Sequence, residues 1–218
     1  METATFSVME LFNLGGIFMW PLLLFSIAVI AISLERIIYI LYHDLRVDDL
    51  YYKINNYVKS NDYSGGCEYL LGLSKRRIGA HIILTLLKQV IPGKAFLVQR
   101  VERAVETEAK NCLNSLENGF DFLTALGSLS PLTGFLGTVS GMIGAFKSIA
   151  EATEVNAQIV ANGIYEALIT TVFGLIIAII AMIAHSILSH IVDKFAAKME
   201  GVCSDLIAQI ESSQGAGK

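Results

Sequence analysis

Residues 130–146 read SPLTGFLGTVSGMIGAF, and the fold of the chain is best approached from this stretch. It carries no charge, which is typical of a membrane span, yet it contains four glycines, one proline and four hydroxyl side chains. Such residues cover a lipid-facing surface poorly, but they let two helix backbones approach each other closely inside a bilayer. The stretch therefore predicts a span that faces protein along at least one side.

Three windows of the chain are free of charge over roughly the length of about 20 residues that a spanning helix needs. They cover residues 17–34, 122–146 and 167–192; the first continues past Glu35 and Arg36 to Tyr42, and Glu166 stands just before the third. The whole chain has 218 residues, of which 54% are hydrophobic, an apolar composition for a soluble domain. We predict an all-α polytopic membrane protein with three transmembrane helices, in preference to three buried helices of a soluble protein.

Basic residues set the predicted orientation. Residues 43–121, between the first two predicted spans, hold eleven of the 16 Lys and Arg residues, and the residues before the first span hold none. The positive-inside rule then places the N-terminus outside, and the long loop and the tail inside. The predicted parts are an outer N-terminal segment (1–16), a first span (17–42), a cytoplasmic helical region (43–121), a second span (122–146), an outer loop (147–163), a third span (164–186) and a cytoplasmic tail (187–218). The net charge of −4 does not suggest a nucleic-acid partner.

The N-terminal segment begins with an acidic residue and leads into an apolar run too long for a cleavable signal peptide. Phe6, Met9, Leu11 and Phe12 precede a glycine hinge at residues 15–16. They fit a short interfacial helix or a frayed terminus, and both interpretations stay open.

The region between the first two spans predicts several helices. Turns are expected at SNDYSGG (60–66) and IPGK (91–94). Apolar residues from Leu97 to Leu116 recur at helical spacing, which predicts a helix running straight into the second span. The third span is expected to continue inward through Ile187, Ile191 and Phe195, so that the second and third helices extend into a cytoplasmic bundle.

Chemistry-bearing motifs are sparse. The sequence contains no phosphate-binding loop, nucleophile elbow or metal-ligand spacing, so neither an enzyme nor a metal or cofactor is expected. Cys67, Cys112 and Cys203 fall on the predicted cytoplasmic side and are expected to be free thiols. The four histidines are scattered and are interpreted as ordinary polar or interfacial residues.

Small residues form a stripe on each of the last two spans. They step by three or four, as a helix face requires: Gly127, Pro131, Gly134, Thr138, Gly141 and Ala145 in the second span, and Gly163, Ala167, Thr170, Gly174, Ala178 and Ala181 in the third, with Thr171 on its edge. The opposite surface of the third span, with Ile176, Ile177, Ile179 and Ile180, is expected to face lipid. The two stripes predict a close-packed seam.

Two ionisable positions lie at span ends. An ionisable residue at a membrane boundary is costly unless it is solvated, protonated or paired, so Glu166 fits either a helix-start role at the interface or a place in an ion path. Glu35 and Arg36 are explained more simply by snorkelling and mutual ion pairing.

LTGFLGTVSGMIGAF (132–146) and NGIYEALITTVFGLIIAI (162–179) together resemble the ExbB/TolQ branch of the MotA/TolQ/ExbB proton channel family, and LER (34–36) resembles the end of its first span. The resemblance implies a homopentamer in the bacterial inner membrane, with spans two and three around a central pore. Inside that pore it implies a single-span ExbD/TolR-type partner that carries a membrane aspartate, and beyond it a TonB- or TolA-type transducer.

Residue by residue, the resemblance places Thr138, Glu166 and Thr171 on the proton path. Thr170 is an extra candidate, since helical spacing puts it nearer the Glu166 face, and which threonine faces the pore stays open. The packing residues of the pore wall are Gly134, Gly141, Gly174 and Ala178. The spans themselves offer no acidic residue at mid-membrane to carry the ion, which points to a partner that supplies one. The hydroxyl of Thr138 has a competing interpretation, a bond to the carbonyl of Gly134 in its own helix.

The resemblance favours an ExbB-like role, energising outer-membrane uptake, over a TolQ-like role in envelope maintenance. A flagellar-stator-like subunit is the nearest alternative, but that type has four spans and a larger cytoplasmic domain. A non-conducting membrane scaffold, in which the small stripes serve packing alone, is the other alternative. The choice between H⁺ and Na⁺ stays open.

Overall fold

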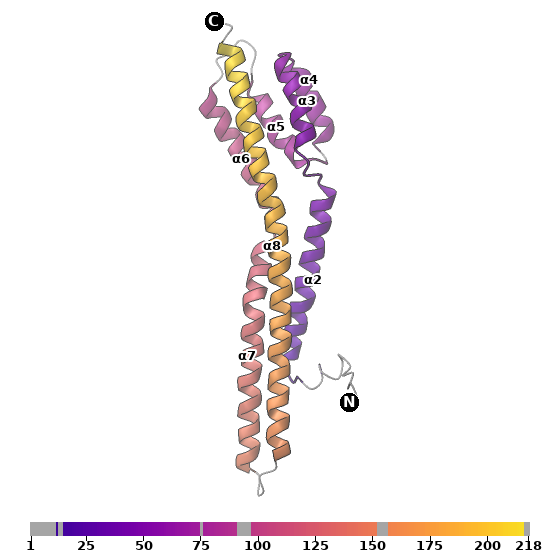
Figure 1. Cartoon of the computed structure of the whole chain (residues 1–218), viewed down its shortest axis with the longest axis vertical. Helices are drawn as coiled ribbons and strands as arrows, with labels where there is room; N and C mark the ends of the chain where they lie inside the picture. The colour runs from indigo at the N-terminus through magenta and orange to yellow at the C-terminus, as the bar shows by residue number, and fades with distance from the viewer. Residues whose placement is uncertain (1–11, 13–14, 75, 91–96, 152–156, 216–218) are drawn as a thin grey trace. The chain divides into compact units, whose positions relative to one another are not determined.

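A computed structural model describes residues 12, 15–74, 76–90, 97–151 and 157–215 of the chain (Figure 1). All regular structure in these residues is helical, as predicted. The helices are α2 (Met19–Tyr42), α3 (Asp48–Lys59), α4 (Tyr63–Leu73), α5 (Ile78–Lys88), α6 (Val98–Glu117), α7 (Phe120–Glu151) and α8 (Ala157–Gly215).

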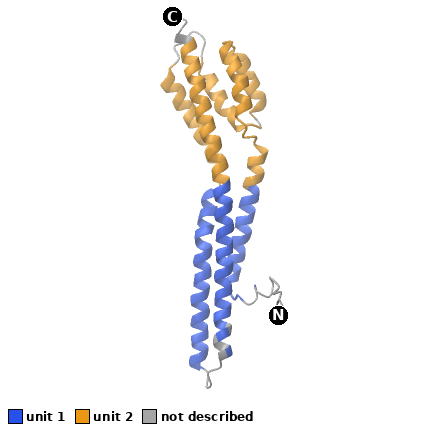
Figure 2. Ribbon diagram, in the orientation of Figure 1, with its two compact units in different colours: residues 1–35, 119–187 blue, residues 36–118, 188–218 orange. Residues whose placement is uncertain are grey.

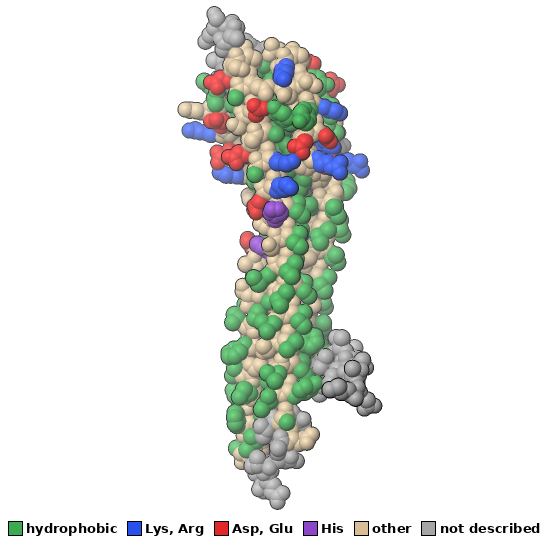
Figure 3. All heavy atoms as spheres, in the orientation of Figure 1, with side chains coloured by type: hydrophobic (Ala, Val, Ile, Leu, Met, Phe, Trp, Pro, Cys, Tyr) green, Lys and Arg blue, Asp and Glu red, His purple; other side chains and the backbone are tan. Residues whose placement is uncertain are grey.

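Three of these helices are long and apolar enough to cross a membrane, which agrees with the three predicted spans. The stretches are Met19–Tyr42, Phe120–Glu151 and Gly163–Ser213. Their outward side chains are large and apolar, among them Trp20, Phe135 and Ile179. On the face drawn in Figure 3, hydrophobic side chains cover these helices, whereas Lys, Arg, Asp and Glu gather mainly on the shorter helices and on the C-terminal part of α8.

The chain divides into two compact units (Figure 2). Unit 1 takes residues 1–35 and 119–187, and therefore most of α2, all of α7 and the first half of α8. Unit 2 takes residues 36–118 and 188–218, with α3 to α6 and the second half of α8.

Unit 2 is a helical bundle with its own apolar core. Helix α5 is apolar on almost every side and is accordingly buried; Ile82, Ile83, Leu86 and Leu87 are at most 1% exposed. Burying a side chain of this size stabilises a fold by about 1.5–3 kcal/mol. Helix α8 adds a stripe at three- and four-residue steps: Leu188, Val192, Phe195, Met199, Cys203, Leu206 and Ile210.

Polar contacts hold α3 against α8 in unit 2. The ammonium group of Lys198 lies 2.7 Å from the carboxylate of Asp48, and the hydroxyl of Tyr51 donates to Asp205. That bond stabilises the neutral phenol beside a carboxylate, so it raises the pKa of Tyr51. These bonds lie at the rim of a contact whose centre is apolar, with Leu50 and Ile54 buried on α3.

The prediction of one continuous helix from the soluble region into the second span is wrong. Helix α6 ends at Glu117 and α7 begins at Phe120. Between them Asn118 has an extended backbone, with ψ at 129°, and Gly119 has φ at +88°, in the left-handed region that glycine adopts without strain. By contrast, the predicted continuation of the third helix is confirmed, because α8 is one helix of 59 residues.

Two predicted connections are shorter than expected. In the SNDYSGG stretch only residues 60–62 form the turn, because Asp62 accepts a bond from the amide of Gly65 and so caps a helix that begins at Tyr63. The predicted outer loop, 147–163, is helical up to Glu151 and again from Ala157. The IPGK turn and most of the predicted interfacial segment lie outside the described residues.

Candidate functional site

Helices α7 and α8 of unit 1 pack along a seam of small residues. A Cβ atom at Gly134 would lie 2.7 Å from the carbonyl oxygen of Thr170, and one at Gly174 would lie 2.5 Å from that of Ser130. At Gly141 it would lie 3.1 Å from the Cβ of Ala167. In the first two cases the added Cβ would meet a backbone oxygen, which no rotamer change can move. Only glycine therefore fits at these two positions without pushing the helices apart.

The predicted small-residue face of α8 lies in this seam. Ala167, Thr170, Gly174, Ala178 and Ala181 are all buried. On α7 the buried face is rotated slightly about the helix axis relative to the predicted stripe, because it also includes Ser130 and Gly137, both buried.

The expectation that Ile177 faces lipid is wrong. Its side chain is 6% exposed, whereas Ile176, Ile179 and Ile180 remain about half exposed. Ile177 lies three residues after Gly174 and one before Ala178, so it belongs to the buried side of the helix rather than to its back.

The two adjacent threonines of α8 occupy different environments. Thr170 is 1% exposed and donates to the carbonyl of Ala167 at 2.7 Å and to that of Gly134 at 3.2 Å. Thr171 is half-buried and donates to the same Gly134 carbonyl, also at 3.2 Å. Within one chain Thr170 therefore lies inside the seam, and Thr171 lies at its edge.

Thr138 lies on an edge of α7, half-buried. Its hydroxyl donates to the carbonyl of Phe135 at 2.6 Å. The competing interpretation from the sequence is a bond from this hydroxyl to the carbonyl of Gly134 in the same helix. The acceptor in the structure is instead the carbonyl of the next residue, Phe135. A bond of this kind can open when a better acceptor arrives, because the hydroxyl is not enclosed.

Glu166 lines a cavity of about 310 Å³ in unit 1. Helix α8 supplies Gly163 and Glu166, and the turn before α2 supplies Gly15, Ile17 and Phe18. Helix α7 supplies the rest of the wall: Gly137, Ser140, Gly141, Gly144, Ala145 and Ser148. Apart from Ile17 and Phe18, the side chains around the carboxyl are small or hydroxyl-bearing.

The turn before α2 touches the Glu166 carboxyl directly. Gly16 has φ at +67°, and a Cβ atom there would overlap the Oε1 atom of Glu166. The left-handed backbone therefore favours glycine at this position, whereas the carboxyl of Glu166, at the end of a flexible and exposed side chain, could move aside for a methyl group.

The structure separates the predicted proton-path residues into two groups. Glu166 faces the cavity, and Thr138 and Thr171 are absent from its lining. Glu166 and Thr171 are five residues apart on one helix, which places them about 140° apart around its axis. Thr170 lies between them inside the seam, against Gly137 on the cavity side.

Arg36, near the end of α2, has a partner that the sequence did not indicate. It is 6% exposed and donates from Nη1 to the carbonyl of Ser115 at 3.0 Å, while its guanidinium lies 4.8 Å from the centre of the Tyr39 ring. Ser115 belongs to the last turn of α6, where unpaired carbonyls attract a cation. The ion pair with Glu35 stays a prediction, and neighbouring residues on a helix do not face each other.

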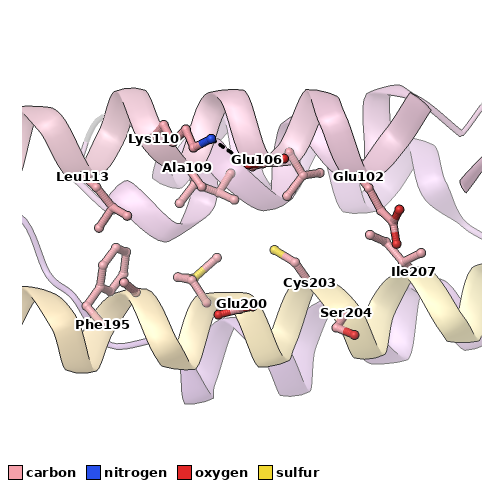
Figure 4. Close-up of a pocket in the computed structure, with 14 residues that line it drawn as sticks. Glu102, Glu106, Ala109, Lys110, Leu113, Phe195, Glu200, Cys203, Ser204 and Ile207 are labelled. Carbon is pink, nitrogen blue, oxygen red and sulfur yellow. Dashed lines mark hydrogen bonds and ion pairs between the residues drawn. The ribbon is translucent and has the colours of Figure 1, made fainter. Parts of the chain in front are cut away.

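A second cavity, of about 550 Å³, lies between α6 and α8 in unit 2. In Figure 4 side chains of α6 and α8 point toward each other across it, with Leu113 opposite Phe195 and the thiol of Cys203 directed inward. Lys110 at its rim is bound to Glu106 at 2.6 Å, which lowers the pKa of that carboxyl. The lining is mostly apolar and carries no arrangement of nucleophile and base.

The three cysteines are free, as predicted. Burial raises the pKa of the Cys203 thiol to about 12. Burial and the nearby carboxylate of Glu108 raise the pKa of Cys112 to about 11. Among the described residues, His, Cys, Asp and Glu form no group of three or more that could hold a metal ion.

Comparison with known proteins gives a consistent result. The MotA/TolQ/ExbB proton channel family matches residues 76–201. The Tol-Pal system protein TolQ of Haemophilus influenzae is 40% identical over 104 residues, 47% of this chain and 46% of that protein. The biopolymer transport protein ExbB of Pseudomonas putida is 33% identical over 111 residues, 51% of this chain and 31% of that protein.

A further relative aligns over most of both chains. An ExbB-like biopolymer transport protein of Synechocystis is 30% identical over 212 residues, 89% of this chain and 77% of that protein. By contrast, the matches to the TolQ and ExbB proteins span less than half of those relatives. The family match covers more than half of this chain, including α7 and the membrane part of α8. The chain is a membrane protein that belongs to the MotA/TolQ/ExbB proton channel family.

Proposed function

We propose that this chain is the pore-wall subunit of a proton-driven motor in the bacterial inner membrane. It works with a single-span partner of ExbD/TolR type, which contributes a membrane aspartate, and a TonB- or TolA-type transducer carries the resulting motion to the periplasm or outer membrane. The wall is a ring of copies, a homopentamer, with α7 and α8 facing the pore. The N-terminus lies in the periplasm and the C-terminus in the cytoplasm.

The observation that carries this proposal is the hydroxyl-bearing edge of the α7–α8 seam. Thr138 and Thr171 lie on that edge half-buried, each with its hydroxyl bonded to a backbone carbonyl of α7. Glycines bring the two helix backbones close together beneath them. A partner's carboxyl moving along such a wall meets hydroxyl groups that bind it weakly and no fixed charge that would hold it.

The relatives support this function in kind. Several of them are named ExbB or TolQ, and this chain matches the same family over residues 76–201. We propose the ExbB-like role, energising uptake across the outer membrane, with the TolQ-like role in envelope maintenance as the other outcome. Complementation of strains that lack one or the other protein separates the two roles. Rescue of uptake alone supports the first, and rescue of envelope integrity alone contradicts it.

Thr138 provides the test of the pore wall. Thr138→Val keeps the side-chain shape and removes the hydroxyl, and hydrogen bonds between membrane helices average only ~0.6 kcal/mol. The oligomer and its bound partner should therefore survive, while proton-driven activity falls sharply. Thr138→Ser keeps the hydroxyl and should be milder. Full activity of Thr138→Val would show that this residue only packs.

A non-conducting scaffold is the competing function, and one observation favours it: the Thr138 hydroxyl is already satisfied within its own helix. Proton flux into liposomes, measured with and without the partner, decides between the two. Flux that requires both chains supports the motor, and no flux under any driving force supports the scaffold.

A further inference from the structure

The last turns of α2 present an apolar face that the described part of the chain leaves uncovered. Residues 36–42 belong to unit 2 (Figure 2), and four of their large side chains are between 43% and 77% exposed: Ile37, Ile38, Leu41 and Tyr42. Their spacing of one and four residues puts them on a single side of the helix. Because α2 is long and apolar enough to cross a membrane, this face suits lipid acyl chains. Tyr42 stands at its end, where aromatic side chains of membrane proteins meet the lipid headgroups.

Arginines follow this face directly, and one carboxylate gathers them. The chain leaves α2 at Tyr42, and the amide of Asp44 donates to the carbonyl of Arg76 at 3.2 Å. The Nη2 atom of Arg77 lies 2.8 Å from the Asp44 carboxylate. The Nε atom of Arg46 lies 4.0 Å from the same carboxylate, which also accepts from the Arg46 amide at 3.1 Å. Asp44 therefore joins the segment after α2 to the segment before α5, and it brings three arginines to one place.

Two of these three guanidinium groups remain available to a ligand. Arg77 is committed to Asp44 and its side chain is only 20% exposed. The Arg46 side chain is 80% exposed, and its contact with Asp44 is at the limit of an ion pair. Arg76 is exposed and forms no ion pair with any residue that the structure describes. One carboxylate does not neutralise three arginines, so this arginine group, Arg46, Arg76 and Arg77, carries an excess of positive charge.

The acidic residues that follow in the sequence leave this excess in place. The carboxylate of Asp48 lies 2.7 Å from the ammonium group of Lys198. Asp49 lies in the first turn of α3, where the amide groups of the helix N-terminus stabilise a negative charge. The surface therefore fits one molecule that is anionic at one end and apolar at the other.

We propose that the arginine group binds the headgroup phosphate of an anionic phospholipid whose acyl chains lie along the exposed face of α2. The planar guanidinium groups of Arg46 and Arg76 match the geometry of phosphate oxygens. A zwitterionic headgroup carries its own cation beside the phosphate and is bound more weakly. A soluble phosphate ester meets the arginines but gains nothing from the apolar face. The inference does not depend on proton conduction, and it holds whichever leaflet lies at this end of α2.

Native mass spectrometry of the full chain, purified in a non-ionic detergent, tests this binding directly. The protein is titrated with phosphatidylglycerol and with phosphatidylcholine of the same acyl chains, and apparent dissociation constants are taken from the fraction that carries lipid. An arginine close to an anionic lipid headgroup tightens binding about fivefold. Arg46→Gln/Arg76→Gln should therefore weaken the binding of phosphatidylglycerol about 25-fold, because two such contacts are lost. The binding of phosphatidylcholine should be almost unchanged.

Two variants control for charge and for folding. Arg100→Gln/Arg103→Gln removes the same charge from two exposed arginines of α6, outside the arginine group, and should keep the wild-type affinity for phosphatidylglycerol. Arg46→Lys/Arg76→Lys keeps the charge and should retain most of the affinity. If the double glutamine variant fails to assemble, Arg46→Gln and Arg76→Gln are measured singly, and each should weaken binding about fivefold.

Three results would overturn the proposal. The first is equal wild-type affinity for the two lipids, and the second is an equal loss in the two double glutamine variants, which would indicate a general effect of net charge. The third is displacement of bound phosphatidylglycerol by an equal concentration of soluble glycerol 3-phosphate, which would assign the arginine group to a free phosphate ester instead of a lipid.

Discussion

Gly134→Ala is expected to destabilise the α7–α8 pair, and the structure sets the size of the effect. The added methyl would lie 2.7 Å from the carbonyl oxygen of Thr170 and 3.0 Å from the Cα of Thr171, both backbone atoms that no rotamer change can move. Ordinary contact begins at 3.4 Å, so the helices must separate by about 0.7 Å at this point. Overpacking of this kind costs about 1–3 kcal/mol.

Separation also weakens the two hydroxyl bonds to the Gly134 carbonyl, each 3.2 Å long. Bonds between membrane helices are worth about 0.6 kcal/mol each. Alanine regains up to about 1 kcal/mol of helix propensity, so the net loss is about 2 kcal/mol. For a chain of this size that lowers the melting temperature by about 4–8 °C.

The matched control for this change is Gly144→Ala, ten residues further along the same helix. Nothing lies within 4 Å of a Cβ atom there, so this variant should keep the wild-type melting temperature or exceed it slightly. The measurement is thermal denaturation of the purified protein in detergent, followed by the fraction that remains in the oligomer peak. Equal melting temperatures for the two variants would refute close backbone packing at Gly134.

Three further changes test other contacts. Gly16→Ala should lower proton-driven activity while leaving the oligomer intact, because the methyl displaces the Glu166 carboxyl and strains a backbone at φ +67°. The control Gly72→Ala, with open space around its Cβ atom, should keep wild-type activity. Equal activity of the two variants would exclude a positioning role for Gly16. Arg36→Gln should lower the free energy of unfolding by about 1–3 kcal/mol, because Arg36 is buried and donates to Ser115. The control Arg46→Gln, at an exposed side chain, should lower it by almost nothing. A larger loss for Arg46→Gln than for Arg36→Gln would be inconsistent with the contact to Ser115. Alkylation at pH 8 should modify Cys203 and Cys112 slowly in the folded protein, because pKa values of about 12 and about 11 leave little reactive thiolate; rapid peptide-level labelling of Cys203 would contradict its burial.

The spans and their small-residue seam could be predicted from the sequence because both depend on local pattern. Charge-free length decides whether a helix crosses a bilayer, and residues at three- and four-residue steps share a face wherever the helix lies. For the same reason Gly134, Gly174 and Ala178 could be assigned to the seam directly. The error at Ile177 came from treating the back of α8 as a single face, although a helix packed closely along one side buries more than its smallest residues.

What the sequence missed depends on contacts between distant segments or on a single backbone angle. The Asn118–Gly119 pair, a common turn dipeptide, marks the break before α7, although the helical spacing on either side of it indicates one continuous helix. The bond from Arg36 to Ser115 joins residues 79 positions apart, and no periodicity reports it. The turn at Gly16 against Glu166 is of the same kind, since neither residue indicates the other.

The separation of Glu166 from Thr171 has a consequence for how a proton could cross. Between the cavity and the Thr171 side chain lie the Thr170 hydroxyl and the Gly134 carbonyl, which accepts from both threonines. A carbonyl oxygen accepts a proton donor but has no proton of its own to pass on, so the seam is a barrier rather than a relay.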